Sequence, residues 1–440
     1  MHYRRAGRVD RDPPSCSQKT ARRLLKPSLL HIVVGIICLV GSDGNVATGA
    51  DAPAVDERAQ LTFLEQHWQT PISPQGKPPA RFSPVEASLD PESCAVCHRL
   101  QYDDWKGSLH SRSMGPGVIG QTLELIHDDP ATAQLCYSCH APLAEQQEKI
   151  HRKRGTRSRF QRNPGFLGPQ QAKGLTCAAC HVRKHERYGP PKRDGSIENS
   201  PSASPVPHGG AIRTPAFERA EFCKGCHQFE ADGYALNGKL LENTYNEWKQ
   251  GPYGRMENSC QSCHMPDRRH LWRGIHDPEM VRAGVTIRLT LDKQRYQVGD
   301  QVEAEITLTN SGVGHYFPTY VTPKVLVRFE LMDGKGGSVK DSVQEERLGR
   351  EVTLDLSREL FDTRIPPGES RTVRYVRPIG RPGVTLKAAV AVAPDDFYVK
   401  FFEAIAPKAK TRKTRALLRE ALNAARRSSF MLFEKEVVLS

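Results

Sequence analysis

The sequence predicts a multidomain protein in which an irregular, mainly α-helical region is followed by an all-β sandwich. Two observations support this prediction. A Cys-x-x-Cys-His motif occurs five times between residues 94 and 264, and the segments between the copies are rich in glycine, proline and arginine. From Val285 onward, apolar and polar residues alternate with a period of two, as they do in half-buried β-strands. The length of 440 residues allows two or three domains of ordinary size.

Residues 1–50 are expected to form a signal peptide. Polar and basic residues precede an apolar run, Leu29–Val40. A membrane-spanning helix needs ~20 apolar residues, so this run of about a dozen is more typical of the core of a signal peptide. We expect cleavage after Ala50 or Ala52, with an uncleaved membrane anchor as the alternative. The mature protein would then be periplasmic or otherwise extracytoplasmic.

Residues 51–93 are expected to form an N-terminal, proline-rich strap around the following domain. Its first part, 55–68, has the pattern of a short helix, and the remainder contains repeated prolines. Proline lacks a backbone N–H donor and cannot continue a helix or a central strand, which predicts an irregular segment.

The five motifs have the pattern that attaches c-type haem. The two thiols of each motif form thioether bonds with the haem vinyl groups, and the histidine binds the iron. The motif cysteines are Cys94, Cys97, Cys136, Cys139, Cys177, Cys180, Cys223, Cys226, Cys260 and Cys263. The adjoining histidines are His98, His140, His181, His227 and His264. A redox dithiol or a zinc ribbon also uses Cys-x-x-Cys, but neither requires a histidine after every pair. The sequence therefore predicts five covalently bound haems c.

The pentahaem domain is expected to span residues 94–283. Successive motifs begin 37–46 residues apart, which suggests a loose repeat with one haem in each unit. Short helices are expected at 142–149 and 242–250, and an irregular excursion at 189–215. Thioether bonds and iron ligation, rather than long helices, are expected to hold this domain together.

The charge and the cysteine count restrict the possible partners and bonds. The formal net charge of +13 raises the possibility of nucleic-acid binding. Haem propionates are negative, however, and basic residues are expected to balance them, so we expect no nucleic-acid partner. Ten of the 12 cysteines belong to the motifs, and the other two, Cys16 and Cys38, lie in the predicted signal peptide. The mature protein is therefore expected to have neither a disulfide nor a free thiol.

Residues 284–440 are predicted to form an immunoglobulin-like β-sandwich with a C-terminal helix and a closing strand. The alternation is clearest at 302–308 and 325–331, and turns containing glycine and proline separate the strands. A helix is expected over 407–427, and the closing strand over 430–439.

A second axial ligand decides what each haem can do. A second histidine gives a low-spin haem suited to electron transfer, whereas an open position allows a small molecule to bind. The candidates for this position are His110, His208, His270, His276 and His315. His110 is the strongest because it follows Trp105 and Ser108 shortly after the first motif, and His315 would tie the β-sandwich to the haem domain. The alternative for each is an ordinary surface or loop histidine.

Several stretches resemble a known family. The segment Pro91–His98, followed by Tyr102, Trp105, Ser108 and His110, is similar to multihaem cytochromes c of the c-552 and c-554 type, which are related to hydroxylamine oxidoreductase. Further similar stretches are Tyr245–Tyr253, Ser259–Pro266 and Gly314–Thr319. The resemblance spans about residues 68–331 and implies closely packed, mostly bis-histidine haems with an electron-transfer role. The chain lacks the Cys-x-x-Cys-Lys motif of pentahaem nitrite reductase, and it has five motifs where hydroxylamine oxidoreductase has eight.

We therefore expect an exported pentahaem cytochrome that carries electrons rather than an enzyme. Its expected partners are redox proteins, either membrane quinol-linked or periplasmic and outer-membrane cytochromes. Membrane contact is expected only through those partners or an uncleaved leader. The alternative is a haem oxidoreductase that acts on a small nitrogen or sulfur compound at one five-coordinate haem. A third possibility is that the β-sandwich docks the protein to a partner complex or to the outer membrane.

Overall fold

The structure, a computed structural model, describes residues 56–154, 157–198 and 206–439. The predicted signal peptide, its cleavage positions and the cysteines Cys16 and Cys38 lie outside the described residues. The chain from residue 55 onward forms one compact unit. Among the described residues, no helix is both long enough and apolar enough to span a membrane.

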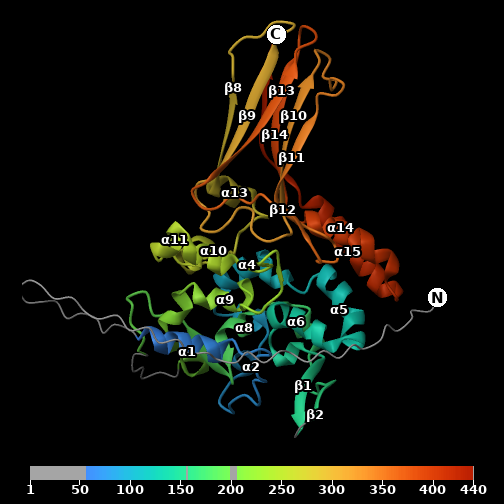
Figure 1. The fold of residues 1–440 in the computed structure, drawn as a ribbon. Coiled ribbons are helices and arrows are strands. Elements are labelled where there is room, and N and C mark those ends of the chain that lie inside the picture. The colour runs from blue at the N-terminus through green and yellow to red at the C-terminus, as the bar shows by residue number, and fades with distance from the viewer. Residues whose placement is uncertain (1–55, 155–156, 199–205, 440) are drawn as a thin grey trace, which may run out of the picture. The chain divides into compact units, whose positions relative to one another are not determined.

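The motif region, residues 56–284, is built from short helices joined by loops (Figure 1). Its α-helices are α1 (Glu57–His67), α2 (Pro84–Ala87), α3 (Pro91–Cys94), α4 (Arg99–Gly107), α5 (Pro116–Asp128), α6 (Pro130–His140), α7 (Gly168–Gln171), α8 (Cys177–His181), α9 (Glu221–His227), α10 (Thr244–Gln250), α11 (Pro252–Arg255), α12 (Cys260–His264) and α13 (Pro278–Gly284). Its 3-10 turns are η1 (His110–Arg112), η2 (Ala144–Gln146), η3 (Pro207–Gly209), η4 (Pro215–Glu218) and η5 (Pro266–Arg268). Many of these helices begin with proline, whose missing N–H is not needed in the first turn.

Three small sheets complete the motif region. A hairpin pairs β1 (Lys149–Arg154) with β2 (Arg157–Arg162), a three-stranded sheet contains β3 (Val182–Arg183), β4 (Glu186–Gly189) and β5 (Ile212–Arg213), and a second hairpin pairs β6 (Ala235–Leu236) with β7 (Lys239–Leu240). The excursion expected at 189–215 is irregular in its described part apart from the short elements β5 and η3.

The helices predicted at 55–68 and 242–250 are confirmed as α1 and α10, but the helix predicted at 142–149 is wrong. That segment contains only the turn η2 before β1 begins. The fully buried Gln146 explains the difference. Its amide nitrogen donates to the carbonyls of Gln170 at 3.0 Å and Gly174 at 2.7 Å. These contacts hold the segment against distant parts of the chain, and the following residues enter the hairpin.

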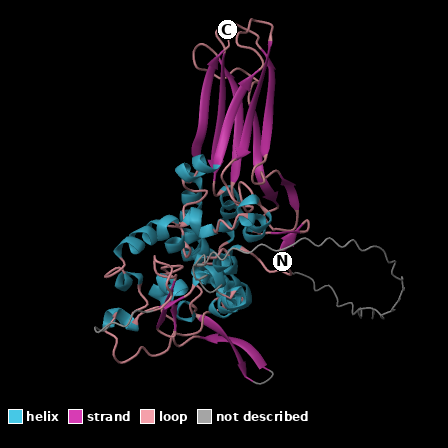
Figure 2. Cartoon of the chain, turned by 90° about the vertical axis from the view of Figure 1, so that its left-hand side faces the viewer, coloured by secondary structure: helices cyan, strands magenta, loops and turns pink. Residues whose placement is uncertain are grey.

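The β region, residues 285–439, contains eight strands (Figure 2). They are β8 (Val285–Leu291), β9 (Gln301–Asn310), β10 (Lys324–Met332), β11 (Gln344–Val352), β12 (Glu359–Asp362), β13 (Ser370–Pro378), β14 (Thr385–Ala393) and β15 (Phe430–Val438). One sheet has the strand order β12-β11-β10-β14-β15 and the other has the order β13-β9-β8. Consecutive strands within each sheet are antiparallel.

The two sheets share one apolar core, which confirms the predicted alternation. In β9, Val302, Ala304, Ile306 and Leu308 are fully buried, while the residues between them are only half-buried. Val325, Val327, Phe329 and Leu331 of β10 belong to the same cluster. Each fully buried aliphatic side chain stabilises a fold by about 1.5–3 kcal/mol, so this core can hold the two sheets together.

Two helices separate the last strands of the β region. The predicted C-terminal helix is confirmed as α15 (Arg412–Arg427), and the sequence did not predict α14 (Asp396–Ile405), which is followed by the turn η6 (Ala406–Lys408). Both helices lie beside α5 (Figure 1). A Cβ atom on Gly117 would lie 2.8 Å from the Phe402 ring, and one on Gly120 would lie 2.8 Å from Leu418. Glycine at these positions of α5 therefore permits the close approach.

Candidate haem-binding site

One connected cavity reaches residues of all five motifs. Its volume is about 2600 Å³, whereas an ordinary small-molecule pocket encloses about 300–1,000 Å³. The residues that line it include His98, His140, His181, His227 and His264. The cavity is therefore large enough for several bulky groups.

Helical geometry places the donors of a motif on one side of the chain. Four of the five motifs lie entirely within helices, namely in α6, α8, α9 and α12. Residues three and four positions apart are neighbours on a helix surface, so the second cysteine and the histidine lie on the same face as the first cysteine. The first motif differs because α3 ends at Cys94 and α4 begins after His98.

None of the ten motif cysteines forms a disulfide. Among the described residues, no group of three or more His, Cys, Asp or Glu side chains could hold a metal ion directly. A structural zinc site would need four such donors close together. The arrangement instead suits cysteines that bond to the edge of a large cofactor while a separate histidine binds its metal.

Cysteines of different motifs lie side by side. Three pairs of thiols are close enough to shift each other's pKa: Cys94 with Cys177, Cys139 with Cys226, and Cys223 with Cys260. Cys180 is close enough to Cys223 and Cys226 to raise the pKa of both thiols. The first motif therefore adjoins the third, and the fourth motif adjoins the second, third and fifth.

Most of the motif histidines have their Nδ1 atom fixed by a backbone carbonyl. Nδ1 of His140 donates to Ser113 at 2.6 Å, that of His181 to Tyr188 at 2.8 Å, and that of His264 to Arg273 at 2.7 Å. Such a bond selects the tautomer in which Nε2 carries no proton and can bind a metal. His227 differs, because its Nδ1 is hydrogen-bonded to a side chain, the hydroxyl of Tyr320, at 2.7 Å.

Three motif histidines face a second histidine from elsewhere in the chain. The ring centres are 6.3 Å apart for His227 and His110, 6.1 Å for His181 and His270, and 6.4 Å for His264 and His315. A metal–imidazole bond is about 2 Å long and the ring centre lies about 1 Å beyond the nitrogen, so two imidazoles on opposite sides of one metal have centres about 6 Å apart. The three separations match this requirement.

Burial keeps these imidazoles neutral. It lowers the pKa of His110 to about 3, and it lowers the pKa values of His181, His227 and His315 to about 4. A histidine must be neutral to give a lone pair to a metal. Together with the paired thiols and the cavity, this set of donors fits haem c.

The comparisons with known proteins agree with this chemistry. Residues 93–160 match the family described as cytochrome c554 and c-prime. The fold is similar to the crystal structure of a penta-haem cytochrome c552 from Thermochromatium tepidum, with a TM-score of 0.56 and 18% sequence identity. That match covers 81% of this chain and 100% of the other. Residues 93–160 therefore carry a segment of this family, and the chain has the fold of a multihaem cytochrome c. Haem c, bound covalently, is therefore the cofactor of this cytochrome.

Other solved structures match about a quarter of the cytochrome. The CARDB domain of a Pyrococcus furiosus protein has a TM-score of 0.15 and 16% identity, and covers 24% of this chain and 67% of that chain. The putative ApaA protein from Bordetella pertussis has a TM-score of 0.14 and 19% identity, and covers 25% and 78%. Such TM-scores carry no argument about the fold. No curated protein matches the sequence.

The other two candidate ligands are His208 and His276. Among the described residues, neither makes a ring contact with a motif histidine, unlike His110, His270 and His315. Nδ1 of His208 donates to the carbonyl of Gly210 at 2.8 Å, its Nε2 has no hydrogen-bond partner among the described residues, and His208 is an electrostatic neighbour of His98. Nε2 of His276 donates to Asp395 at 3.1 Å, and its buried Nδ1 has no hydrogen-bond partner within the described chain.

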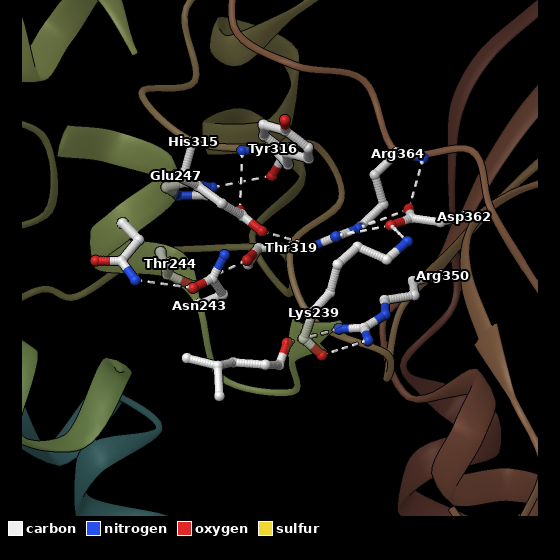
Figure 3. Close-up of polar contacts among 12 residues, drawn as sticks. Lys239, Asn243, Thr244, Glu247, His315, Tyr316, Thr319, Arg350, Asp362 and Arg364 are labelled. Carbon is white, nitrogen blue, oxygen red and sulfur yellow. Dashed lines mark hydrogen bonds and ion pairs between the residues drawn. The ribbon is translucent and has the colours of Figure 1, made fainter. Parts of the chain in front are cut away.

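A loop of the β region reaches the cavity of the cytochrome. This loop joins β9 to β10 and carries His315 and Tyr320, and Figure 3 shows how it is anchored. Glu247 of α10 accepts a hydrogen bond from the backbone N–H of Tyr316 at 3.2 Å and an ion pair from Arg364 at 2.7 Å. The side chains of Glu247 and Arg364 are each only 4% exposed. Burial raises the pKa of Glu247 even though the guanidinium opposes the shift.

Two residues close to His227 were not found from the sequence. The Tyr320 hydroxyl is hydrogen-bonded to Nδ1 of His227, and Glu242 is an electrostatic neighbour of that hydroxyl. Neither residue belongs to a motif or to a periodic pattern, so only the folded loop could reveal them.

Proposed function

We propose that this protein is an exported pentahaem cytochrome c that carries electrons through closely packed haems, most of which have two histidine ligands. The observation that supports it best is the set of three histidine pairs at 6.1–6.4 Å, each joining a motif histidine to a histidine from another segment. Two histidines per iron give a low-spin haem that changes oxidation state without binding a substrate.

The ligand assignments follow from these pairs. We assign His110 to the iron of His227, His270 to that of His181, and His315 to that of His264. For the iron of His98 we assign His208, whose free Nε2 and electrostatic proximity to His98 support the choice. Each haem would be attached by the two cysteines of one motif. These pairs are Cys94 and Cys97, Cys136 and Cys139, Cys177 and Cys180, Cys223 and Cys226, and Cys260 and Cys263.

The contacts between thiols support close packing of the cofactors. They suggest a chain in the order of the first, third, fourth and fifth motifs, with the second motif joined to the fourth. The polypeptide would hold these groups in a fixed order and tune each potential through ligand, burial and neighbouring charge.

Location and partners are part of the same proposal. The apolar leader suggests export to the periplasm or another extracytoplasmic compartment. The partners would be redox proteins, either membrane quinol-linked or periplasmic and outer-membrane cytochromes, with no nucleic acid. Membrane contact would occur only through these partners or an uncleaved leader. We also retain the proposal that the two sheets of the β region form an immunoglobulin-like sandwich.

The number of haems can be tested by intact mass. Protein produced with a working haem-attachment system should exceed the mass of its mature polypeptide by five haems, and its N-terminus should lie near residues 48–53. A thiol reagent should label none of its cysteines after denaturation, because Cys16 and Cys38 leave with the signal peptide. A Cys260→Ala/Cys263→Ala variant should carry four haems, and a wild-type mass with fewer than five at full occupancy would contradict the count.

A second candidate function is a haem oxidoreductase that acts on a small nitrogen or sulfur compound. One observation favours it: no imidazole of the described residues makes a ring contact with His140. Tyr398 lies close to Cys136 of the same motif and to Asp395, which accepts the hydrogen bond from His276. Tyr398, Asp395 and His276 line the cavity and could deliver protons to a bound substrate.

Cyanide binding separates the two candidate functions. The oxidoreductase requires one high-spin haem in the resting ferric protein and uptake of one equivalent of cyanide, because an open position admits small anions. Optical and electron paramagnetic resonance spectra with a cyanide titration would measure both. A wholly low-spin protein that binds no cyanide would exclude this candidate and leave the electron carrier.

A further inference from the structure

The hydrogen-bond acceptor of His227 differs in kind from those of His140, His181 and His264. The latter three donate to backbone carbonyls, which can only accept. His227 donates to the hydroxyl of Tyr320. A hydroxyl accepts one hydrogen bond and donates another, so its strength as an acceptor depends on the group behind it.

Tyr320 is held in a conformation that a bulky residue rarely adopts. Its φ angle is +65°, in the left-handed region, which is strained for such a side chain. The preceding Thr319 bonds through its hydroxyl to Thr244 of α10 at 2.9 Å (Figure 3). Tyr320 is half-buried and lines the cavity. The loop therefore adopts a strained backbone conformation at Tyr320, and this conformation places the hydroxyl against His227.

The direction of each hydrogen bond follows by elimination. When Nε2 of His227 binds a metal, Nδ1 carries the proton and donates to the Tyr320 oxygen. The hydroxyl proton must then point to another acceptor, and Glu242 and Thr244 are both within reach. Burial raises the pKa of Glu242 to about 8, so this carboxyl is mainly protonated at neutral pH. The arrangement is a hydrogen-bonded chain from His227 through Tyr320 to Glu242 or Thr244.

The hydrogen bonds at His227 matter because the fourth motif lies at a junction between other motifs. The fourth motif adjoins the second, third and fifth motifs through neighbouring thiols. A change in the potential at this junction would therefore alter electron movement in three directions, whereas a change at the first motif would alter only the exchange with the third.

We propose that Tyr320 is a positioning residue for His227 and that it sets the reduction potential of the haem bound by Cys223 and Cys226. This inference rests on the proposed ligation of that haem by His227 and His110. An acceptor on Nδ1 makes an imidazole a stronger electron donor to the metal and stabilises oxidised iron. Tyr320 thus keeps the potential of the junction haem low.

The His110→Ala variant allows the potential of the junction haem, the one bound by Cys223 and Cys226, to be measured separately from the others. Without the second histidine, this haem should become high spin and gain a separate absorption band. Adding Tyr320→Phe removes the acceptor but keeps the aromatic ring. We expect the reduction equilibrium of the high-spin component to shift about tenfold toward the reduced form, which raises the midpoint potential by about 59 mV. Spectroelectrochemical titration of both holoproteins would measure the shift.

Tyr375→Phe is the matched control. Tyr375 is fully buried in the β region, and its hydroxyl donates to the carbonyl of Ser342 at 2.7 Å. The control loses one hydrogen bond of a buried tyrosine without touching the cavity, so all potentials should stay unchanged. Glu242→Gln keeps an acceptor behind the Tyr320 hydroxyl and should give a smaller shift than Tyr320→Phe.

The outcomes distinguish this inference from the proposed function. If His110→Ala produces a high-spin component whose potential is the same with and without Tyr320→Phe at full haem content, the role of Tyr320 is excluded. If His110→Ala produces no high-spin component, the pairing of His110 with His227 is excluded instead. In that case Tyr320→Phe in the otherwise wild-type protein still tests Tyr320, because exactly one of the haem potentials should rise.

Discussion

Replacing His110 by alanine is expected to convert one haem of the purified cytochrome from low spin to high spin. The His110 ring lies 6.3 Å from that of His227, and its Nδ1 has no hydrogen-bond partner within the described chain. Alanine cannot bind iron, so the position opposite His227 would become open to small molecules. The other haems should change little, since their own histidines and thioether bonds remain.

The measurement is the number of high-spin haems and of cyanide equivalents bound, both relative to the wild-type protein. Each should increase by one, after intact mass has shown that the haem content is unchanged. His127→Ala is the control, because His127 lies exposed in the last turn of α5. A folded His110→Ala protein with the wild-type spin distribution would show that His110 is not a ligand.

The sequence predicted those elements whose pattern is local. The strands of the β region follow from the alternation at 302–308 and 325–331, because one face of each strand must pack into the shared core. The β1–β2 hairpin was missed because its strands are basic and carry no apolar alternation, so backbone pairing defines it. α14 was missed although Asp395 occupies its N-cap position, where the side chain makes no capping hydrogen bond.

In the candidate site too, residues in local motifs were predictable, whereas residues placed by long-range contacts were not. The motif cysteines and histidines are local in sequence, and helical spacing brings them to one face. The second histidines depend on long-range contacts, and His110 meets the fourth motif rather than the first one that it follows. Three of the five candidates lie beside a motif histidine, but the pairing could not be predicted, because loops and the β region place these residues. Tyr320 had no local signal at all.

Replacing Arg364 by alanine is expected to loosen the loop that carries His315. Arg364 pairs with Glu247 at 2.7 Å and with Asp362 at 2.9 Å, and Glu247 is almost entirely buried while Asp362 is partly buried. Glu247 also holds the backbone of Tyr316, next to His315. Removing one partner of a buried ion pair costs about 3–5 kcal/mol, because the remaining charge loses its compensation. Here Glu247 would lose its guanidinium while its pKa is already raised by burial.

The loss should be visible at the haem of His264, whose paired ring belongs to His315. In a urea titration, one low-spin haem of Arg364→Ala should become high spin at a lower urea concentration than in the wild type, before the remaining haems change. Arg364→Lys keeps the charge but not the forked geometry of the guanidinium, and should lie between the two. Arg371→Ala is the matched control, since the pair of Arg371 with Glu346 is exposed and such pairs contribute about 0–1 kcal/mol. An Arg364→Ala protein whose spin transition coincides with that of Arg371→Ala would show that the ion pair does not hold the His315 loop in place.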